Sequence, residues 1–269
     1  MTSPEEQQAP VTDYFQKDAA FWDSLYEGTD VFSVIHRERA ARAISEVGRL
    51  PLMVGSRVLE VGCGAGSVAI RLASRGYLVE ATDSTPAMIE LTRRNAQRAG
   101  LTARLTTAIA DVHALEYPDA SFDLVVALGV LPWLHSPKQA MREIARVLRP
   151  GGFLVANTDN RARLTHFLDP LFNPLLQPVR RRLGRGRRAG PSTTTVWSRA
   201  FDRDLVAVGL KKQRGFTLGF GPFTFLGRSA LRGKAAAVLQ TKLQELADER
   251  LPLLRSTGSQ YMVVAKKVT

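Results

Sequence analysis

Residues able to hold a small ligand gather first at the end of a short apolar run. Glu60 stands in that run, and Gly62, Gly64 and Gly66 follow it at alternate positions. Glycine adopts backbone conformations closed to other residues and lets the main chain approach a ligand closely. The pattern predicts a buried strand, a tight turn and a helix over about 67–74. Such a turn is typical of a nucleotide-type cradle.

Two carboxylates follow later strands. Asp83 comes directly after a predicted strand over 77–82, 21 positions beyond Gly62. A carboxylate there can accept hydrogen bonds from both hydroxyls of a ribose. Asp111 follows a predicted strand over 104–109, where it either contacts the ligand or caps a turn.

The spacing of the glycines separates two kinds of nucleotide-binding turn. A dinucleotide site has Gly-x-Gly-x-x-Gly, and the position of its third glycine is occupied here by Ser67. Acid-x-Gly-x-Gly-x-Gly instead resembles motif I of the class I S-adenosylmethionine-dependent methyltransferases. The resemblance continues at Ala110-Asp111, Phe122-Asp123 and Pro150-Gly151-Gly152, and it covers about residues 57–157. For the glycine motif alone, an unrelated strand-to-helix turn is the alternative.

The resemblance implies S-adenosylmethionine as cofactor and a role for each acid. Glu60 would organise the ammonium end of the methionine tail, Asp83 would bind the ribose, and Asp111 would bind the adenine amino group. The single cysteine, Cys63, excludes an intrachain disulfide and fits the turn as a small residue. The cofactor-binding residues that the resemblance implies are Glu60, Gly62, Cys63, Gly64, Gly66, Asp83, Ser84, Met88, Asp111, Val112 and Leu128.

Strands and helices alternate along the chain, as a doubly wound sheet requires. With the resemblance, the fold expected is α/β: a Rossmann-like, seven-stranded, mostly parallel sheet with helices on both faces and an antiparallel last strand. Inserted helices are expected after strands five and six. We expect a helical N-terminal lid at 1–50, the cofactor-binding core at 51–160, and basic insertions with the last two strands at 161–269. Within the first part, residues 1–12 are expected to be a loose tail.

A second, closer resemblance concerns the acceptor side. Tyr14-Phe15, Trp22, Tyr26 and the stretch 190–195 are similar to the magnesium-protoporphyrin IX O-methyltransferases. That likeness implies Tyr26 as a catalytic residue. The chain departs from that family in two places. The family has a histidine just after strand four, and its position falls near Trp133 here; the insertion at 222–256 has no counterpart in the family. The substrate-binding candidates are Tyr14, Trp133 and His166, and no metal site is expected.

Charge divides the chain. Residues 1–160 hold 16 Lys and Arg against 19 Asp and Glu, whereas residues 161–269 hold 21 against 6. The basic part favours an anionic partner. We expect an anionic or amphipathic small-molecule acceptor and peripheral contact of 164–188 with an anionic membrane. No apolar run approaches 18 residues, so a cytoplasmic location is expected.

The function expected is S-adenosylmethionine-dependent O-methylation of a small acidic or phenolic, amphipathic metabolite. The alternatives are a nucleic-acid methyltransferase and a non-catalytic protein that binds a membrane or a partner. The arginine cluster at 180–188 has no interleaved aromatic residues for stacking on bases, which argues against nucleic acid. The intact set of glycines and acids argues against a non-catalytic role. Oligomeric state cannot be read from the sequence.

Overall fold

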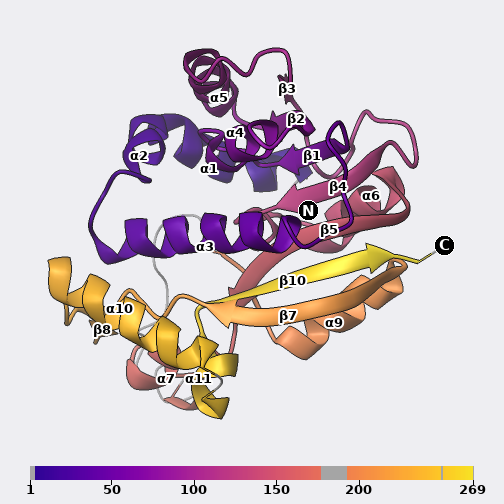
Figure 1. Ribbon diagram of the computed structural model, residues 1–269. Helices are drawn as coiled ribbons and strands as arrows, with labels where there is room; N and C mark the ends of the chain where they lie inside the picture. Colours follow the sequence, from indigo (N-terminus) through magenta and orange to yellow (C-terminus); the bar gives the residue numbers. More distant parts are fainter. Residues whose placement is uncertain (1–3, 177–192, 250, 269) are drawn as a thin grey trace.

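The computed structural model describes residues 4–176, 193–249 and 251–268. Figure 1 shows a twisted central sheet with helices on both of its faces. The strands run in the order β3-β2-β1-β4-β5-β10-β7, and the short β6 pairs with β5. Their bounds are β1 Arg57–Val61, β2 Leu78–Asp83, β3 Leu105–Ile109, β4 Phe122–Ala127, β5 Leu148–Asn160, β6 Thr195–Val196, β7 Leu210–Leu218 and β10 Gln260–Lys267.

The expected fold class is confirmed. Strands β1 to β5 pair parallel to one another, and the last strand, β10, pairs antiparallel with both β5 and β7. The described residues contain eight strands in this sheet instead of seven, because the two-residue β6 joins it. A separate hairpin is formed by β8 (Thr224–Phe225) and β9 (Arg228–Ser229).

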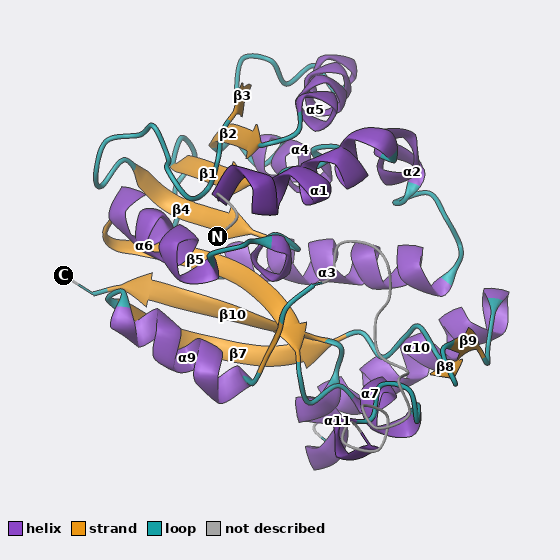
Figure 2. Ribbon diagram, turned by 180° about the vertical axis from the view of Figure 1, so that it is seen from behind, coloured by secondary structure: helices purple, strands orange, loops and turns teal. Residues whose placement is uncertain are grey.

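The central strands are buried on both faces, so their sequences are apolar runs without alternation. In β1, Val58 packs into the core on one face and Leu59 into the core on the other. Helices α3 (Val31–Val47) and α4 (Ser67–Ala73) cover the first face. Helices α6 (Pro137–Val147) and α9 (Ser198–Ala207) cover the second, which is turned toward the viewer in Figure 2.

The expectation of a loose N-terminal tail is wrong for residues 4–12. Helix α1 runs over Pro4–Lys17 and is followed by α2 over Ala19–Ser24. The sequence of α1 is polar and contains Pro10, so intrinsic propensity gives little sign of a helix. Tertiary contacts supply the stability that propensity lacks: Tyr14 stacks on Trp133 with ring centroids 5.8 Å apart. The division of the chain into lid, core and basic part stays a prediction.

Strand β5 begins at Leu148, before the end of the Pro150-Gly151-Gly152 sequence. Its first residues include the Pro-Gly-Gly turn, and Gly152 explains why. A Cβ atom at Gly152 would lie 2.9 Å from the carbonyl oxygen of Arg149 and 3.1 Å from that of Asp123. Only glycine therefore lets this edge of β5 pack against β4.

The basic part of the chain holds the insertions. After β5 come α7 (Leu164–Leu168) and the 3₁₀ turn η2 (Pro174–Leu176), and between β7 and β10 lie α10 (Gly233–Asp248) and α11 (Pro252–Thr257). Inserted helices after the fifth predicted strand and after β7 were expected. The arginine cluster at 180–188 lies outside the described residues. In the part that is described, no helix is long and apolar enough to cross a membrane.

Candidate active site

A cavity of about 330 Å³ opens where β1, β2 and β4 end. Ligands of open α/β sheets bind at these carboxyl ends. Helices α1, α2 and α3 form the opposite wall, with Phe15, Trp22 and His36 among the lining residues. The cavity is thus enclosed between the sheet and the N-terminal helices.

Most of the sequence candidates come together in this cavity, although their roles in binding stay predictions. The cofactor candidates that line it are Glu60, Gly62, Cys63, Gly64, Asp83, Ser84, Met88, Asp111, Val112 and Leu128. Tyr26 and Trp133 also line it. Gly66, Tyr14 and His166 do not lie among the lining residues.

The glycine turn is shaped by two different constraints. Gly62 has φ +65°, and a Cβ there would lie 2.2 Å from Cγ2 of Val130. Gly64 has φ +56°, and a Cβ there would meet no atom within 4 Å. The main chain at Gly64 is therefore open toward the cavity, which is the bare backbone surface that a closely bound ligand needs.

Gly66 acts in packing. It has φ +81° and is the N-cap of α4. A Cβ there would lie 2.8 Å from Cγ2 of Thr92 on α5 (Pro86–Arg98). The third glycine of the motif thus brings the start of α4 close to α5.

Glu60 is a buried carboxyl with an unsatisfied oxygen. Its side chain is 3% exposed, and Oε2 is enclosed with no hydrogen-bond partner among the described residues. Burial raises the pKa of Glu60 from 4.5 to about 8. A buried carboxylate of this kind is costly unless a cation or a donor meets it. An ammonium group in the cavity would supply both.

Asp83 lies where the turn and the second strand meet. Its Oδ2 accepts from the backbone N–H of Gly64 at 3.1 Å, and its Oδ1 accepts from that of Thr85 at 2.9 Å. Burial raises the pKa of this carboxyl. Asp83 also lines the cavity, where a carboxylate can accept hydrogen bonds from ligand hydroxyls.

Asp111 is held in place by a histidine. Oδ1 of Asp111 accepts from the backbone N–H of His113 at 2.9 Å and lies 2.7 Å from Nδ1 of the same residue. This hydrogen bond holds the pKa of Asp111 below its usual value. The His113 ring stacks on His135 with centroids 3.9 Å apart. The Asp111 side chain remains 56% exposed, so it is free to contact a ligand.

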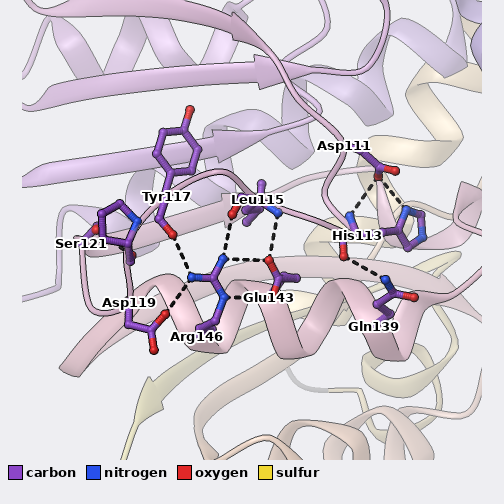
Figure 3. A network of polar contacts seen from close by, with 10 residues as sticks. Asp111, His113, Leu115, Tyr117, Asp119, Ser121, Gln139, Glu143 and Arg146 are labelled. Carbon is purple, nitrogen blue, oxygen red and sulfur yellow. Dashed lines mark hydrogen bonds and ion pairs between the residues drawn. The ribbon is translucent and has the colours of Figure 1, made fainter.

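The loop after Asp111 is fastened to α6, as Figure 3 shows. Arg146 donates to the carboxylates of Glu143 and Asp119 and to the carbonyl oxygens of Leu115 and Tyr117. Closer to Asp111, Gln139 of α6 donates to the carbonyl of His113 at 3.0 Å. These bonds fix the segment that presents Asp111 at the cavity.

Two of the substrate candidates lie outside the cavity lining. Tyr14 packs behind two lining residues, because its ring contacts those of Trp133 and Phe15. His166 lies on α7 and stacks on Phe172 with ring centroids 5.5 Å apart. Burial and the nearby Arg163 lower the pKa of His166 to about 4.

Sequence reasoning missed Arg39 and left open whether His36 lies near the reacting methyl group. Both lie on α3 and line the cavity, and they are 8% and 5% exposed. The guanidinium of Arg39 lies against Gly129, where a Cβ would come within 2.8 Å of Nη1. Arg39 makes no hydrogen bond or ion pair within the described residues. The only sequence signal was that His36 and Arg39 are three positions apart and so share one face of a helix. The other polar residues around them obscure this pattern.

Comparison with known proteins identifies a methyltransferase domain in part of the chain. Residues 59–156 match the family model described as methyltransferase domain. The chain is 41% identical over 108 residues to 27-O-demethylrifamycin SV methyltransferase of Amycolatopsis mediterranei (strain S699), a match that covers 40% of each protein. The chain thus spans about half or less of the length of the curated relatives that it matches.

Solved structures show the same fold over nearly the whole chain. The [4+2]-cyclase SpnF superposes with a TM-score of 0.65 at 18% identity, covering 100% of this chain and 98% of that one. The magnesium protoporphyrin IX methyltransferase ChlM of Synechocystis PCC 6803, with bound SAH, superposes with a TM-score of 0.61 at 18% identity, covering 96% and 98%. These likenesses show the fold, and the match over residues 59–156 shows that this part of the chain is a methyltransferase domain.

Proposed function

We propose that this chain binds S-adenosylmethionine in the cavity and transfers its methyl group to an oxygen of a small acidic or phenolic, amphipathic acceptor. The observation that carries the proposal is the buried carboxyl group of Glu60, which has one unpartnered oxygen and lines the same cavity as the bare backbone of Gly64. The amino-acid tail of the cofactor has an ammonium group that can bind Glu60, and the tail must pass close to the backbone of Gly64. The residues present therefore fit this cofactor.

The cofactor would lie along the ends of the strands. Glu60 would hold its ammonium group, Asp83 its ribose hydroxyls, and Asp111 with the N–H of Val112 its adenine. Arg39 also lines the cavity and has no ion pair within the described residues, so its guanidinium group would bind the carboxylate of the methionine tail. When bound, the cofactor supplies a methyl group on a sulfonium, which is already activated for displacement.

The chain itself must then align the acceptor and exclude water. Alignment of this kind can contribute effective molarities of about 10⁵ M or more. The cavity lining includes Trp22, Tyr26, Phe32 and Trp133, which offer apolar surface for a planar or amphipathic molecule. Arg163, paired with Asp159 at 3.2 Å, also lines the cavity and adds positive charge. These residues support a small acceptor with a polar and an apolar part.

Tyr26 is our candidate for positioning the acceptor oxygen. It lines the cavity, and its main-chain oxygen accepts from Arg37 at 3.3 Å, which holds this loop against α3. We expect Tyr26→Phe to lower kcat about 10-fold or more while leaving the affinity for S-adenosylhomocysteine unchanged, because a hydroxyl that touches only the acceptor acts on the transition state. The assay is transfer of labelled methyl from S-adenosylmethionine to a panel of phenols and small acids. Equal turnover of the two proteins on the best acceptor would remove Tyr26 from the mechanism.

The two cavity-facing glycines provide a matched pair of variants. Both have positive φ, so alanine at either costs roughly 1–2 kcal/mol of backbone strain. Gly62→Ala should also clash with Val130 and lose about 1–3 kcal/mol more of unfolding free energy. Gly64→Ala meets no protein atom but fills the space of the ligand, so its main effect should be weaker S-adenosylhomocysteine binding. Urea unfolding and calorimetry separate the two effects, and a Gly64→Ala protein with full affinity would contradict the placement of the cofactor.

Contact with an anionic membrane stays a prediction. Leu168 and Leu175 are 63% and 77% exposed, which suits such a contact, whereas the arginines at 180–188 lie outside the described residues. Sedimentation with anionic vesicles tests it, and a protein that stays in the supernatant at low salt would exclude it.

A further inference from the structure

His36 is the one histidine of the described residues that lines the cavity. Its side chain is only 5% exposed. Nδ1 lies 2.8 Å from the carbonyl oxygen of Phe32, one turn earlier on α3. A carbonyl oxygen can only accept, so Nδ1 carries the hydrogen. In the neutral ring, Nε2 is then left with a lone pair and no hydrogen.

That lone pair has no partner in the protein. Nε2 of His36 makes no hydrogen bond within the described residues, and it is not sealed off as Nε2 of His113 is. It is therefore reached from the cavity. Burial and the charge of Arg39 lower the pKa of His36 to about 3, which keeps the ring neutral at physiological pH.

The ring is also fixed in orientation. It packs against Phe32 with centroids 4.1 Å apart and against Trp22 with centroids 6.0 Å apart. Together with the bond from Nδ1, these contacts leave the imidazole little freedom to turn. One wall of the cavity thus presents a fixed hydrogen-bond acceptor.

A hydrogen-bond acceptor held in one place favours some classes of methyl-accepting molecule over others. A carboxylate has no hydrogen to donate, so its lone pairs would face the lone pair of Nε2. A phenol or another neutral hydroxyl can donate directly to Nε2. An unpaired buried acceptor costs about 1–3 kcal/mol, so this wall favours a ligand with an O–H group.

We propose that Nε2 of His36 accepts the hydroxyl hydrogen of the methyl acceptor, and that the acceptor is a phenol or a similar neutral hydroxyl compound instead of a carboxylate. The proposal rests on the proposed methyl transfer and narrows its acceptor class. It makes His36 a catalytic residue, because the ring would touch the reacting oxygen.

The step balances as follows. An electron pair on the acceptor oxygen forms the bond to the methyl carbon, and the carbon–sulfur bond breaks with its pair remaining on sulfur. The oxygen becomes strongly acidic as it gains the methyl group, so its proton passes to Nε2 even though His36 is a weak base. The imidazolium that results is unstable in this buried place beside Arg39, and it returns the proton to solvent.

Three probes with one ring system test the proposal: 2-naphthol, 2-methoxynaphthalene and 2-naphthoate. Their binding to protein saturated with S-adenosylhomocysteine is measured by equilibrium dialysis at pH 7, where naphthol is neutral. We expect wild type to bind naphthol about 10-fold more tightly than the methyl ether, as one hydrogen bond to a buried acceptor gives, and to bind the carboxylate most weakly.

Substitution of His36 should remove this preference. His36→Phe keeps the ring packing and should bind naphthol and the ether equally, whereas His36→Gln, whose amide oxygen can accept, should restore part of the difference. A preference that survives in His36→Phe, or a naphthoate that binds best, would overturn the proposal.

Two further readouts keep the test decisive. If His36→Phe does not fold, the ¹⁵N shifts of His36 in wild type take its place: naphthol should shift Nε2 and leave Nδ1 protonated, and an unmoved Nε2 would overturn the proposal. If wild type fails to bind S-adenosylhomocysteine, the proposed function is contradicted. The naphthalene series without S-adenosylhomocysteine would then still decide the role of His36.

Discussion

Replacing Asp83 with alanine is expected to weaken binding of S-adenosylhomocysteine about 10- to 150-fold, the equivalent of about 1.5–3 kcal/mol for charge-assisted hydrogen bonds lost from a buried site. The carboxylate accepts from the N–H groups of Gly64 and Thr85, and the residue lines the cavity. Isothermal titration calorimetry measures the loss directly.

The same variant also releases the turn, so a control is needed. Thr92→Val removes a hydroxyl that donates to the carbonyl of Gly64 at 2.7 Å, and Thr92 does not line the cavity. It should loosen the turn without removing a ligand contact, and its affinity should stay within a few-fold of wild type. If Asp83→Ala binds as tightly as Thr92→Val, the ribose does not lie at Asp83.

Glu60 should make cofactor binding release a proton. Its folded-state pKa is raised from 4.5 to about 8 by burial, so at pH 7 the carboxyl is mostly protonated in the free protein. A bound ammonium group favours the carboxylate, and binding at pH 7 should therefore release up to about one proton. Calorimetry in two buffers of different ionisation enthalpy counts it.

The number of protons released on binding should depend on pH. Above about pH 9 the free carboxyl is already ionised, so the release should vanish there. Glu60→Gln should show no release at any pH and should bind about 10- to 100-fold more weakly. A wild-type protein that releases no proton at pH 7 would show that no cation meets Glu60.

The raised pKa also affects stability without ligand. Between pH 4.5 and 8 the folded state holds a proton that the unfolded state has lost. The contribution of Glu60 to the free energy of unfolding is therefore present at low pH and is lost as the pH rises through this window. Glu60→Gln should remove that part of the fall, and urea titrations at several pH values would show it.

The cofactor half of the site could be predicted because its residues lie at the ends of strands. A strand ends at a definite residue, and the carboxyl ends of parallel strands meet at one edge of the sheet. Glu60, Gly64 and Asp83 could therefore be placed together from their positions at the strand ends and from the resemblance to motif I, and all three line the cavity. Their contacts with the cofactor stay predictions.

The wall of the cavity formed by the N-terminal helices could not be predicted, because it is built by packing between segments that are distant in the sequence. Arg39 and His36 face the cavity only because α3 packs on the sheet with one particular face. Residues 4–12 of helix α1 were predicted to be a tail because their own sequence favours a helix weakly, and the aromatic contacts of α1 with Trp133 cannot be seen in the sequence. Tertiary contact decides all three.

The central claim is that one cavity holds the whole cofactor, and a crystal structure of the protein soaked with S-adenosylhomocysteine tests it most directly. The account predicts the amino group at Glu60, the carboxylate at Arg39, the ribose hydroxyls at Asp83 and the adenine at Asp111 and Val112. Ligand density at another place, or a cavity that stays free of ligand at saturating concentration, would contradict it.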